Sequence, residues 1–466
     1  MNLSASPARS AYTRLAAGVL FPLHERLKGH HSVVLRQELE RSQWLNADEL
    51  RQLQLRRLRA FLALAGQRVP YYQRLFQQTG FEPAKIRSID DLQRLPLLTK
   101  SDIRADVEAF KATGHGVLKR YNTGGSSGEP LVFYMDRDRI SHDVAAKWRA
   151  TRWWGVDIGD TELVVWGSPV ELGSQDRVRR LRDGLMRSHL LPAFEMSTQN
   201  LDRFVDTIAR VRPAMLFGYP SSLSLIASHA RARGRALDDL GIRVVFVTSE
   251  RLYDEQRVLL EAVFGCPVAN GYGARDAGFI AHQCPHGRLH ISAEDIVVET
   301  VRPDGSCTPP GEPGEIAVTH LRTPDFPLVR YRTGDVGVLS ADTCPCGRGL
   351  AVLKEVHGRT TDFVVAADGT VMHGLALIYT VRDIRGVEQF KITQQSLSLV
   401  EVQLVANAHL PHDAEARIVR DFKARLGVAV QVVVTRVAAI PPEKSGKHRY
   451  VVSKVAPPAG AGQSHA

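Results

Sequence analysis

The sequence predicts an α/β large N-terminal domain followed by a smaller α+β C-terminal domain. Two observations carry this prediction. Between about residues 120 and 340, short β-branched runs such as 162–166 and 243–248 alternate with helical stretches such as 201–211. This alternation is typical of helices layered on a buried, largely parallel sheet. A second group of strand and helix patterns begins near residue 362 and is long enough for a separate core of roughly 100 residues.

The elements support this division in chain order. Residues 50–62 place apolar positions at helical spacing with arginines opposite, so the N-terminal part is expected to be helical. In the smaller domain, 397–406 alternates as a strand, 413–426 as a helix and 428–437 as another strand. Residues 457–466 include a proline- and glycine-rich run and are expected to be disordered.

Domain boundaries follow from these patterns. We predict a helical N-terminal segment packed on the large domain, the large domain itself, a small C-terminal domain and a disordered tail, at residues 1–95, 96–361, 362–456 and 457–466.

Composition limits the class of protein. Of the 466 residues, 44% are apolar and 24% are charged, as in ordinary soluble globular proteins. The net charge of +10 is spread over arginines along the chain, without a dense lysine tract. This distribution favours solvated helix faces and a site for anionic ligands, and it argues against nucleic acid as a partner.

Cysteine content and hydropathy bear on location. Five cysteines, an odd number, favour a reducing cytoplasm over a disulfide framework. No run approaches the ~18 apolar residues of a membrane span, so no transmembrane segment is expected. The apolar run 15–23 lacks a small-residue cleavage site, which argues against a secretory signal. Contact of an amphipathic helix with a membrane surface stays open as an alternative. We predict a cytoplasmic protein of undetermined oligomeric state.

Residues 123–130 form the most informative segment, Thr-Gly-Gly-Ser-Ser-Gly-Glu-Pro. Glycines and hydroxyl residues make a flexible loop whose N–H and O–H groups can converge on a polyphosphate. The loop is not a Walker A motif, because no lysine follows its last glycine. A surface linker is the alternative reading.

Four further segments follow this loop along the chain, and their order matters for the comparison with known families. They are Gly-Tyr-Gly-Ala-Arg-Asp at 271–276, Tyr-Arg-Thr-Gly-Asp at 331–335, His-Gly-Arg-Thr-Thr-Asp at 357–362 and Ser-Gly-Lys at 445–447. This series resembles the adenylate-forming superfamily of acyl-CoA synthetases. In detail it is similar to the phenylacetate–CoA ligase-like branch, and within it to the proteins of capsular polysaccharide biosynthesis. The resemblance extends from about residue 69 to about residue 454.

The resemblance implies the adenylate-forming fold, with a mobile small domain, and the use of ATP and Mg²⁺. It also assigns residues to the phosphates, namely Thr123, Gly124, Ser126, Ser127 and Gly128. The family usually has a lysine where this chain has Glu129, so the role of that position is open. Tyr272 would flank the adenine. Asp276 stands where the family has a glutamate that binds Mg²⁺.

The remaining matched positions complete the implied site. Asp335 and Arg359 match residues that hold the ribose and the nucleotide, and a carboxylate suits the two hydroxyls of a diol. Asp362 matches the hinge between the domains. Lys447 would be the catalytic cation that reaches the α-phosphate when the small domain closes, with Lys444 as its nearest competitor.

A separate cysteine pattern predicts a zinc site. Cys284-Pro-His286-Gly-Arg and Cys344-Pro-Cys346-Gly-Arg are near copies, and three thiolates with one imidazole form a common tetrahedral shell. Many members of the family that this chain resembles carry a Gly/Arg-x-His-Ile motif, which here contains His290. The motif favours His290 as the fourth ligand, with His286 as the alternative. Unpaired core cysteines are the competing interpretation.

The expected activity is ATP-dependent conversion of a carboxylic acid to an acyl-adenylate, followed by acyl transfer to CoA or another thiol, with a role in polysaccharide biosynthesis as one setting. Two alternatives stay open. One is amide or ester formation without CoA, in which an amine or a sugar hydroxyl is the acceptor. The other is a nucleotide-binding scaffold without turnover, which the departures at Glu129 and Asp276 would favour.

Overall fold

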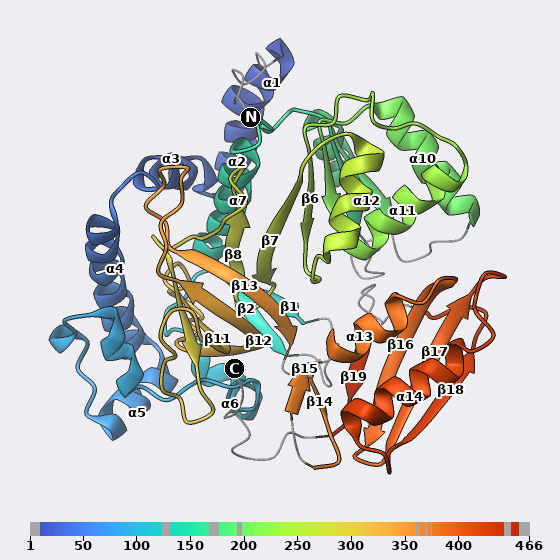
Figure 1. Cartoon of the computed structure of the whole chain (residues 1–466). Helices are drawn as coiled ribbons and strands as arrows, with labels where there is room; N and C mark the ends of the chain where they lie inside the picture. The colour runs from blue at the N-terminus through green and yellow to red at the C-terminus, as the bar shows by residue number, and fades with distance from the viewer. Residues whose placement is uncertain are drawn as a thin grey trace.

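The computed structural model describes residues 10–123, 131–166, 177–192, 198–359, 363–368, 371–373, 375–441 and 449–455. Within these ranges the chain forms a large unit around one mixed sheet and a smaller C-terminal unit around a four-stranded sheet (Figure 1). None of the helices in the described ranges is long and apolar enough to cross a membrane.

Helices form the first part of the chain, as the pattern at 50–62 predicts. The longest, α4 (Ala47–Arg68), begins with a capping box in which the Asn46 and Glu49 side chains each accept a hydrogen bond from the other residue's backbone N–H. Its buried face packs with α5 into the core that covers one side of the large sheet. The elements up to the first strand are α1 (Ala11–Leu15), the π-helical turn η1 (Ala16–Leu20), α2 (Phe21–Leu27), α3 (Ser32–Ser42), α4, α5 (Pro70–Thr79), η2 (Pro83–Lys85), η3 (Ile89–Arg94), α6 (Lys100–Ala105) and η4 (Val107–Phe110).

The large sheet has eleven strands in the order β10-β11-β12-β13-β9-β8-β7-β6-β5-β3-β4. Strands β4, β3, β5, β6 and β7 are parallel, whereas every pair from β7 to β10 is antiparallel. The prediction of a largely parallel sheet is therefore wrong for this second half. Strands β7 to β13 follow one another without helices between them, and strands joined by short turns pair as antiparallel neighbours.

The bounds of these strands match the β-branched runs of the sequence. The strands are β3 (Glu162–Trp166), β4 (Ser188–Pro192), β5 (Met215–Gly218), β6 (Val244–Thr248), β7 (Val268–Ala274), β8 (Gly278–Gln283), β9 (Leu289–Ile291), β10 (Ile296–Val301), β11 (Pro313–His320), β12 (Tyr331–Ser340) and β13 (Val352–Arg359).

Helices cover the parallel half of the sheet. α10 (Thr198–Val211), α11 (Pro220–Ala232) and α12 (Asp254–Phe264) share a core of buried aliphatic side chains with β3, β5 and β6. The long helix α7 (Arg137–Arg152) packs against α3 and β8, and α9 (Arg177–Leu185) precedes β4. The hairpin of β1 (Lys119–Asn122) and β2 (Val132–Met135) pairs separately from the large sheet.

One junction inside the large sheet is short. Strands β9 and β13 pair at only two positions, Val352 opposite His290 and Leu353 opposite Leu289. By contrast, β12 and β13 pair at six positions between Asp335 and Ser340. On one side of this contact lie β10 to β13, and on the other side lie β3 to β9. The short β9–β13 ladder therefore connects the two parts of the sheet.

The C-terminal unit is an α+β module, as its pattern predicts. Its sheet has the order β18-β17-β16-β19, and a core of buried aliphatic and aromatic side chains lies between the sheet and its helices. The elements are β14 (Phe363–Val365), β15 (Val371–His373), α13 (Leu375–Arg382), β16 (Val387–Ser396), β17 (Leu399–Ala406), α14 (Ala414–Leu426), β18 (Gln431–Arg436) and β19 (Val451–Ser453). The tail expected to be disordered lies outside the described residues.

The two units touch at the start of α12. Arg382 of α13 forms an ion pair with Glu255, with Nη1 2.9 Å from Oε1, and its guanidinium lies 4.2 Å from the ring centroid of Tyr253. The Tyr253 ring also meets Tyr450 edge-on at 5.6 Å. Tyr450 lies just before β19, so these contacts hold the start of β19 against the large unit.

Candidate functional site

The parallel half of the large sheet directs several strand ends to one edge. Strands β3, β5, β6 and β7 run in the same direction, so their carboxyl ends meet there, where open α/β sheets commonly bind ligands. Trp166, at the end of β3, stacks on Tyr219 after β5 with ring centroids 4.3 Å apart. This edge is therefore where a ligand site is expected.

The segment that follows β6 has a constrained backbone. Ser249 has a φ of 71°, which is left-handed and costly for a residue with a Cβ; such conformations gather at functional sites. Glu250 accepts a hydrogen bond from the Ser221 N–H at 3.2 Å, and Arg251 donates to the His357 carbonyl at 2.9 Å. Residues 249–251 stand in none of the sequence motifs, and only the backbone angle and these contacts single them out.

Tyr272 and Asp335 are in direct contact. The Tyr272 hydroxyl, on β7, donates to Asp335 Oδ2, on β12, at 2.9 Å. Burial, and then the nearby Asp335 carboxylate, raise the pKa of Tyr272 well above its ordinary value. The hydroxyl is therefore protonated at neutral pH and donates to the carboxylate. The structure thus joins the residues predicted to meet the adenine and the ribose.

Asp276 is buried beside the same strands. It is 6% exposed, and its Oδ2 accepts a hydrogen bond from the Tyr331 hydroxyl. Arg139 holds the backbone of this turn by donating to the carbonyls of Arg275, at 3.0 Å, and Asp276, at 3.3 Å. Tyr331 begins the 331–335 motif but was given no role from sequence, and Arg139 was not singled out because it belongs to no recognisable ligand pattern.

Thr123 fixes the base of the predicted phosphate loop. Its N–H donates to the Leu131 carbonyl at 3.0 Å, and its Oγ1 accepts from the Leu131 N–H at 2.9 Å. The hydroxyl proton is still available as a donor. The other predicted phosphate ligands, Gly124, Ser126, Ser127 and Gly128, lie outside the described residues, as does Glu129.

Arg359 lies directly opposite Asp335 in the β12–β13 ladder, so the backbone brings these two predicted nucleotide contacts to adjacent positions. The side chain of Arg359 is outside the described part of the chain. So are Asp362, Lys444 and Lys447, whose predicted roles at the hinge and at the α-phosphate remain predictions.

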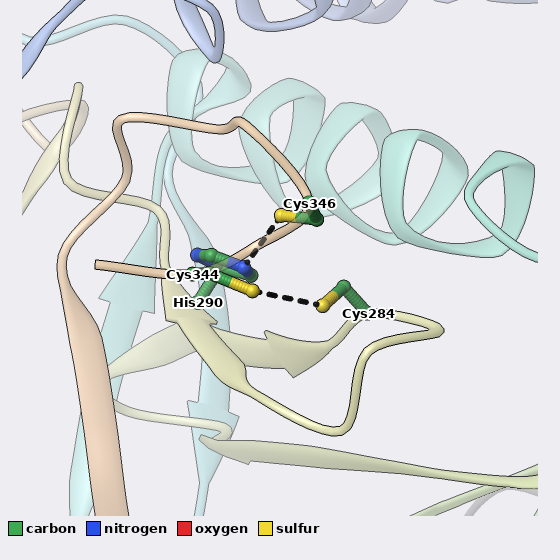
Figure 2. Close-up of side chains that lie close together, drawn as sticks. All are labelled: Cys284, His290, Cys344 and Cys346. Carbon is green, nitrogen blue, oxygen red and sulfur yellow. Dashed lines mark hydrogen bonds between the residues drawn. The ribbon is translucent and has the colours of Figure 1, made fainter. Parts of the chain in front are cut away.

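The four predicted zinc ligands come together in one cluster (Figure 2). Cys284 follows β8, His290 lies in β9, and Cys344 and Cys346 belong to the loop that leads into β13. All four ligand atoms lie within 4.8 Å of one another. We call this group the thiol cluster. His286, the alternative ligand, is exposed and is not part of it.

Burial and neighbouring hydrogen bonds shift the pKa values of three members of the thiol cluster. At Cys346, burial acts to raise the pKa of the thiol, but hydrogen bonds from Arg348 outweigh it and lower that pKa. Burial lowers the pKa of His290 to about 4 and raises that of Cys344 to about 12. The imidazole is therefore neutral at physiological pH. The remaining cysteines lie elsewhere: Cys266 packs in the core under α12, and the Cys307 thiol donates to Glu299.

The chain is similar in sequence to known proteins over most of its length. Residues 364–454 match the family model described as the CapK C-terminal domain. The phenylacetate-coenzyme A ligase of Thermus thermophilus is 26% identical over 439 residues, covering 88% of this chain and 97% of the ligase. Protein CapK of Staphylococcus aureus is 23% identical over 412 residues, covering 88% of this chain and 90% of CapK.

A solved structure shares the fold. The crystal structure of 2-hydroxyisobutyryl-CoA ligase, in the postadenylation state with R3-HIB-AMP, superposes with a TM-score of 0.72 at 20% identity. The match covers 89% of this chain and 92% of the ligase. The expected fold class, an α/β large domain with a smaller α+β C-terminal domain, is thereby confirmed.

Proposed function

We propose that this chain, a member of the phenylacetate–CoA ligase-like and CapK branch of the adenylate-forming superfamily, activates a carboxylic acid with ATP and transfers the acyl group to CoA. The observation that carries the proposal is the 2.9 Å hydrogen bond between Tyr272 and Asp335. It joins two segments 63 residues apart in sequence at the edge where a nucleotide would bind. The similarity to CoA ligases over most of the chain supports the acceptor.

The first step forms the acyl-adenylate. An oxygen of the substrate carboxylate attacks the α-phosphorus of ATP, the bond to the bridging oxygen of the β-phosphate breaks, and pyrophosphate leaves with the electron pair. Asp335 would accept hydrogen bonds from the ribose hydroxyls, and Thr123 and its loop would donate to the phosphates. Lys447 would balance the negative charge that accumulates at the α-phosphate.

Asp276 would hold Mg²⁺ directly or through a water. Its carboxylate is a hard oxygen ligand, and the hydrogen bond from Tyr331 leaves further lone pairs available for an ion or its hydration shell. When bound, the ion would neutralise charge on the phosphates. Arg139 supports this arrangement by fixing the backbone that carries the carboxylate.

The second step transfers the acyl group. The CoA thiolate attacks the carbonyl carbon of the adenylate, a thioester forms, and AMP leaves. In such a two-step reaction, a small domain on a hinge near Asp362 can complete first one site and then the other.

A second candidate uses a different acceptor. The resemblance of the sequence motifs to proteins of capsular polysaccharide biosynthesis favours this candidate, and residues 364–454 match the CapK C-terminal domain. A sugar hydroxyl or an amine would then take the acyl group in place of CoA. The first step would be the same, and the test below separates the two candidates.

The proposal is tested by incubating the purified chain with ATP, Mg²⁺ and a panel of carboxylic acids, with and without CoA. Mass spectrometry should detect AMP and acyl-CoA in equal amounts, and only when all components are present. Acid-dependent AMP formation that CoA does not stimulate would favour the second candidate. Absence of AMP with every acid would count against both.

A matched pair of lysine variants tests the assignment of the catalytic cation. Lys447→Ala should lower the rate of adenylation by about 100- to 1000-fold, the scale for removing one charged stabiliser of a transition state. Lys444→Ala, three residues away, should leave most of the rate. The reverse pattern would show that Lys444 is the catalytic lysine.

A further inference from the structure

We propose that the thiol cluster binds a structural zinc ion that clamps the short β9–β13 junction and thereby holds Asp335 in contact with Tyr272. The proposal has two parts, a metal site and a mechanical role, and they rest on different observations. Only the second part depends on the proposed nucleotide site.

The spacing of the ligand atoms fits a tetrahedral zinc shell. With Zn–S bonds of about 2.3 Å and Zn–N bonds of about 2.0 Å, tetrahedral angles place two sulfurs about 3.8 Å apart and a sulfur and a nitrogen about 3.5 Å apart. The Cys284 and Cys344 sulfurs are 3.7 Å apart, and Cys346 Sγ lies 3.3 Å from His290 Nε2. Both pairs are marked in Figure 2.

The imidazole is already oriented as a ligand. Its Nδ1 lies 3.1 Å from the Leu350 carbonyl, which can only accept, so Nδ1 carries the proton. The lone pair of Nε2 then points to the sulfurs. A backbone carbonyl on the far ring nitrogen is the usual support of a zinc-bound histidine. Trp153 packs edge-on against the ring at 5.9 Å and shields it from solvent.

Charge and burial also fit a metal. Cys284 and His290 are fully buried and Cys344 is 6% exposed. Three thiolates and Zn²⁺ would carry a net charge of −1, which a buried site must balance. Arg348 follows Cys346 by two residues, and its guanidinium lies over the Trp153 ring at 4.5 Å. A permanent cation is thus available beside the cluster.

The ligands come from both sides of the weak junction. Cys284 and His290 belong to the β8–β9 side, whereas Cys344 and Cys346 precede β13. A metal would therefore make two strong bonds to each side of a ladder that has only two residue pairs. Because β13 pairs with β12 and β8 pairs with β7, the same junction lies between the strands of Asp335 and Tyr272. Without the clamp, these two side chains should lose their fixed separation.

The first experiment measures metal content. Protein purified without chelator should contain about one zinc per chain by elemental analysis, and His290→Ala and Cys344→Ser should lose it. His286→Ala and Cys266→Ser are the matched controls and should keep it. Wild-type protein without zinc, a Cys284–Cys344 disulfide in mass spectrometry, or equal loss in the controls would overturn the site.

Cobalt substitution keeps the test valid if the variants fail to fold. Wild-type protein exchanged into Co²⁺ should show the intense visible bands of a tetrahedral ion and the near-ultraviolet bands of thiolate ligation. An octahedral spectrum without thiolate bands would overturn the tetrahedral assignment.

The clamp itself is tested by nucleotide affinity. Removing the metal from wild-type protein, under conditions where circular dichroism shows the fold retained, should weaken ATP binding by about tenfold. Adding back zinc should restore it. If the holoprotein binds ATP and metal removal leaves the affinity unchanged, the mechanical role is wrong although the zinc site stands. If the holoprotein does not bind ATP, the proposed function fails. The mechanical role of the metal is then tested by amide hydrogen exchange, which metal removal should speed in β9 and β13.

Discussion

At the scale of single residues, the proposed nucleotide site depends most on the contact between Tyr272 and Asp335. An aspartate that will accept ribose hydroxyls must be held in place before the ligand arrives, and the Tyr272 hydroxyl holds one of its oxygens. Asp335 is also fixed from its backbone, since its N–H donates to the Thr333 hydroxyl at 3.1 Å. The site is thus partly organised without ligand.

Tyr272→Phe keeps the ring but removes one hydrogen bond to the Asp335 carboxylate, which is worth about 1.5–3 kcal/mol. Because the lost bond would act on ATP only through Asp335, ATP binding should weaken by less than this energy, by several-fold. Isothermal titration calorimetry measures the change. Tyr12→Phe is the matched control, since it also removes a tyrosine hydroxyl bond, to the Leu185 carbonyl, far from the site. Equal ATP affinities for wild type and Tyr272→Phe would contradict the role of this contact.

At the scale of elements, the loop that carries Cys344 and Cys346 is held on its outer side by the turn between α3 and α4. Gly349 N–H donates to the Gln43 carbonyl at 3.0 Å, and the Gln43 side chain accepts from Trp153 and from Arg348. The loop therefore connects the N-terminal helices, α7 and the large sheet. Gly349 permits this approach because the chain leaves no room for a Cβ there.

Gly349→Ala should lower the free energy of unfolding by about 1–3 kcal/mol, the usual cost of overpacking. The added Cβ would lie only 1.8 Å from the Leu45 carbonyl oxygen, so the loop or the turn must move. Chemical denaturation measures the loss. Gly184→Ala is the control: its Cβ would meet nothing within 4 Å in helix α9, so that variant should be neutral or slightly more stable. A Gly349→Ala protein as stable as wild type would disprove the close approach.

At the scale of the whole molecule, much of the fold follows from sequence patterns, and the site follows only in part. The β-branched runs at 162–166 and 243–248 form β3 and β6, and the family resemblance supplies the overall fold. Pattern alone could not give the direction of strands β8 to β13, because alternation along a strand does not reveal its neighbour. Residues such as Arg139 and Ser249 were missed because their roles depend on backbone geometry.

The arrangement of the two units also depends on contacts that no motif reveals. Arg382→Ala removes the ion pair with Glu255 and the contact with Tyr253, so the C-terminal unit should detach from the large unit more often. Hydrogen–deuterium exchange of peptides that cover residues 250–260 should become faster. Arg436→Ala, which breaks an ion pair with Glu415 inside the C-terminal unit, should leave those peptides unchanged. Faster exchange in both variants would indicate general destabilisation.

ATP–pyrophosphate exchange shows whether the edge near Tyr272 and Asp335 forms an acyl-adenylate. With Mg²⁺ and a suitable carboxylic acid, labelled pyrophosphate should enter ATP without any acyl acceptor, because adenylation is reversible. Asp335→Ala should weaken ATP binding and so reduce exchange at low ATP, with partial recovery at high ATP. If the protein binds ATP but no carboxylic acid supports exchange, the proposed adenylation is wrong. The chain would then be a nucleotide-binding protein without adenylation activity.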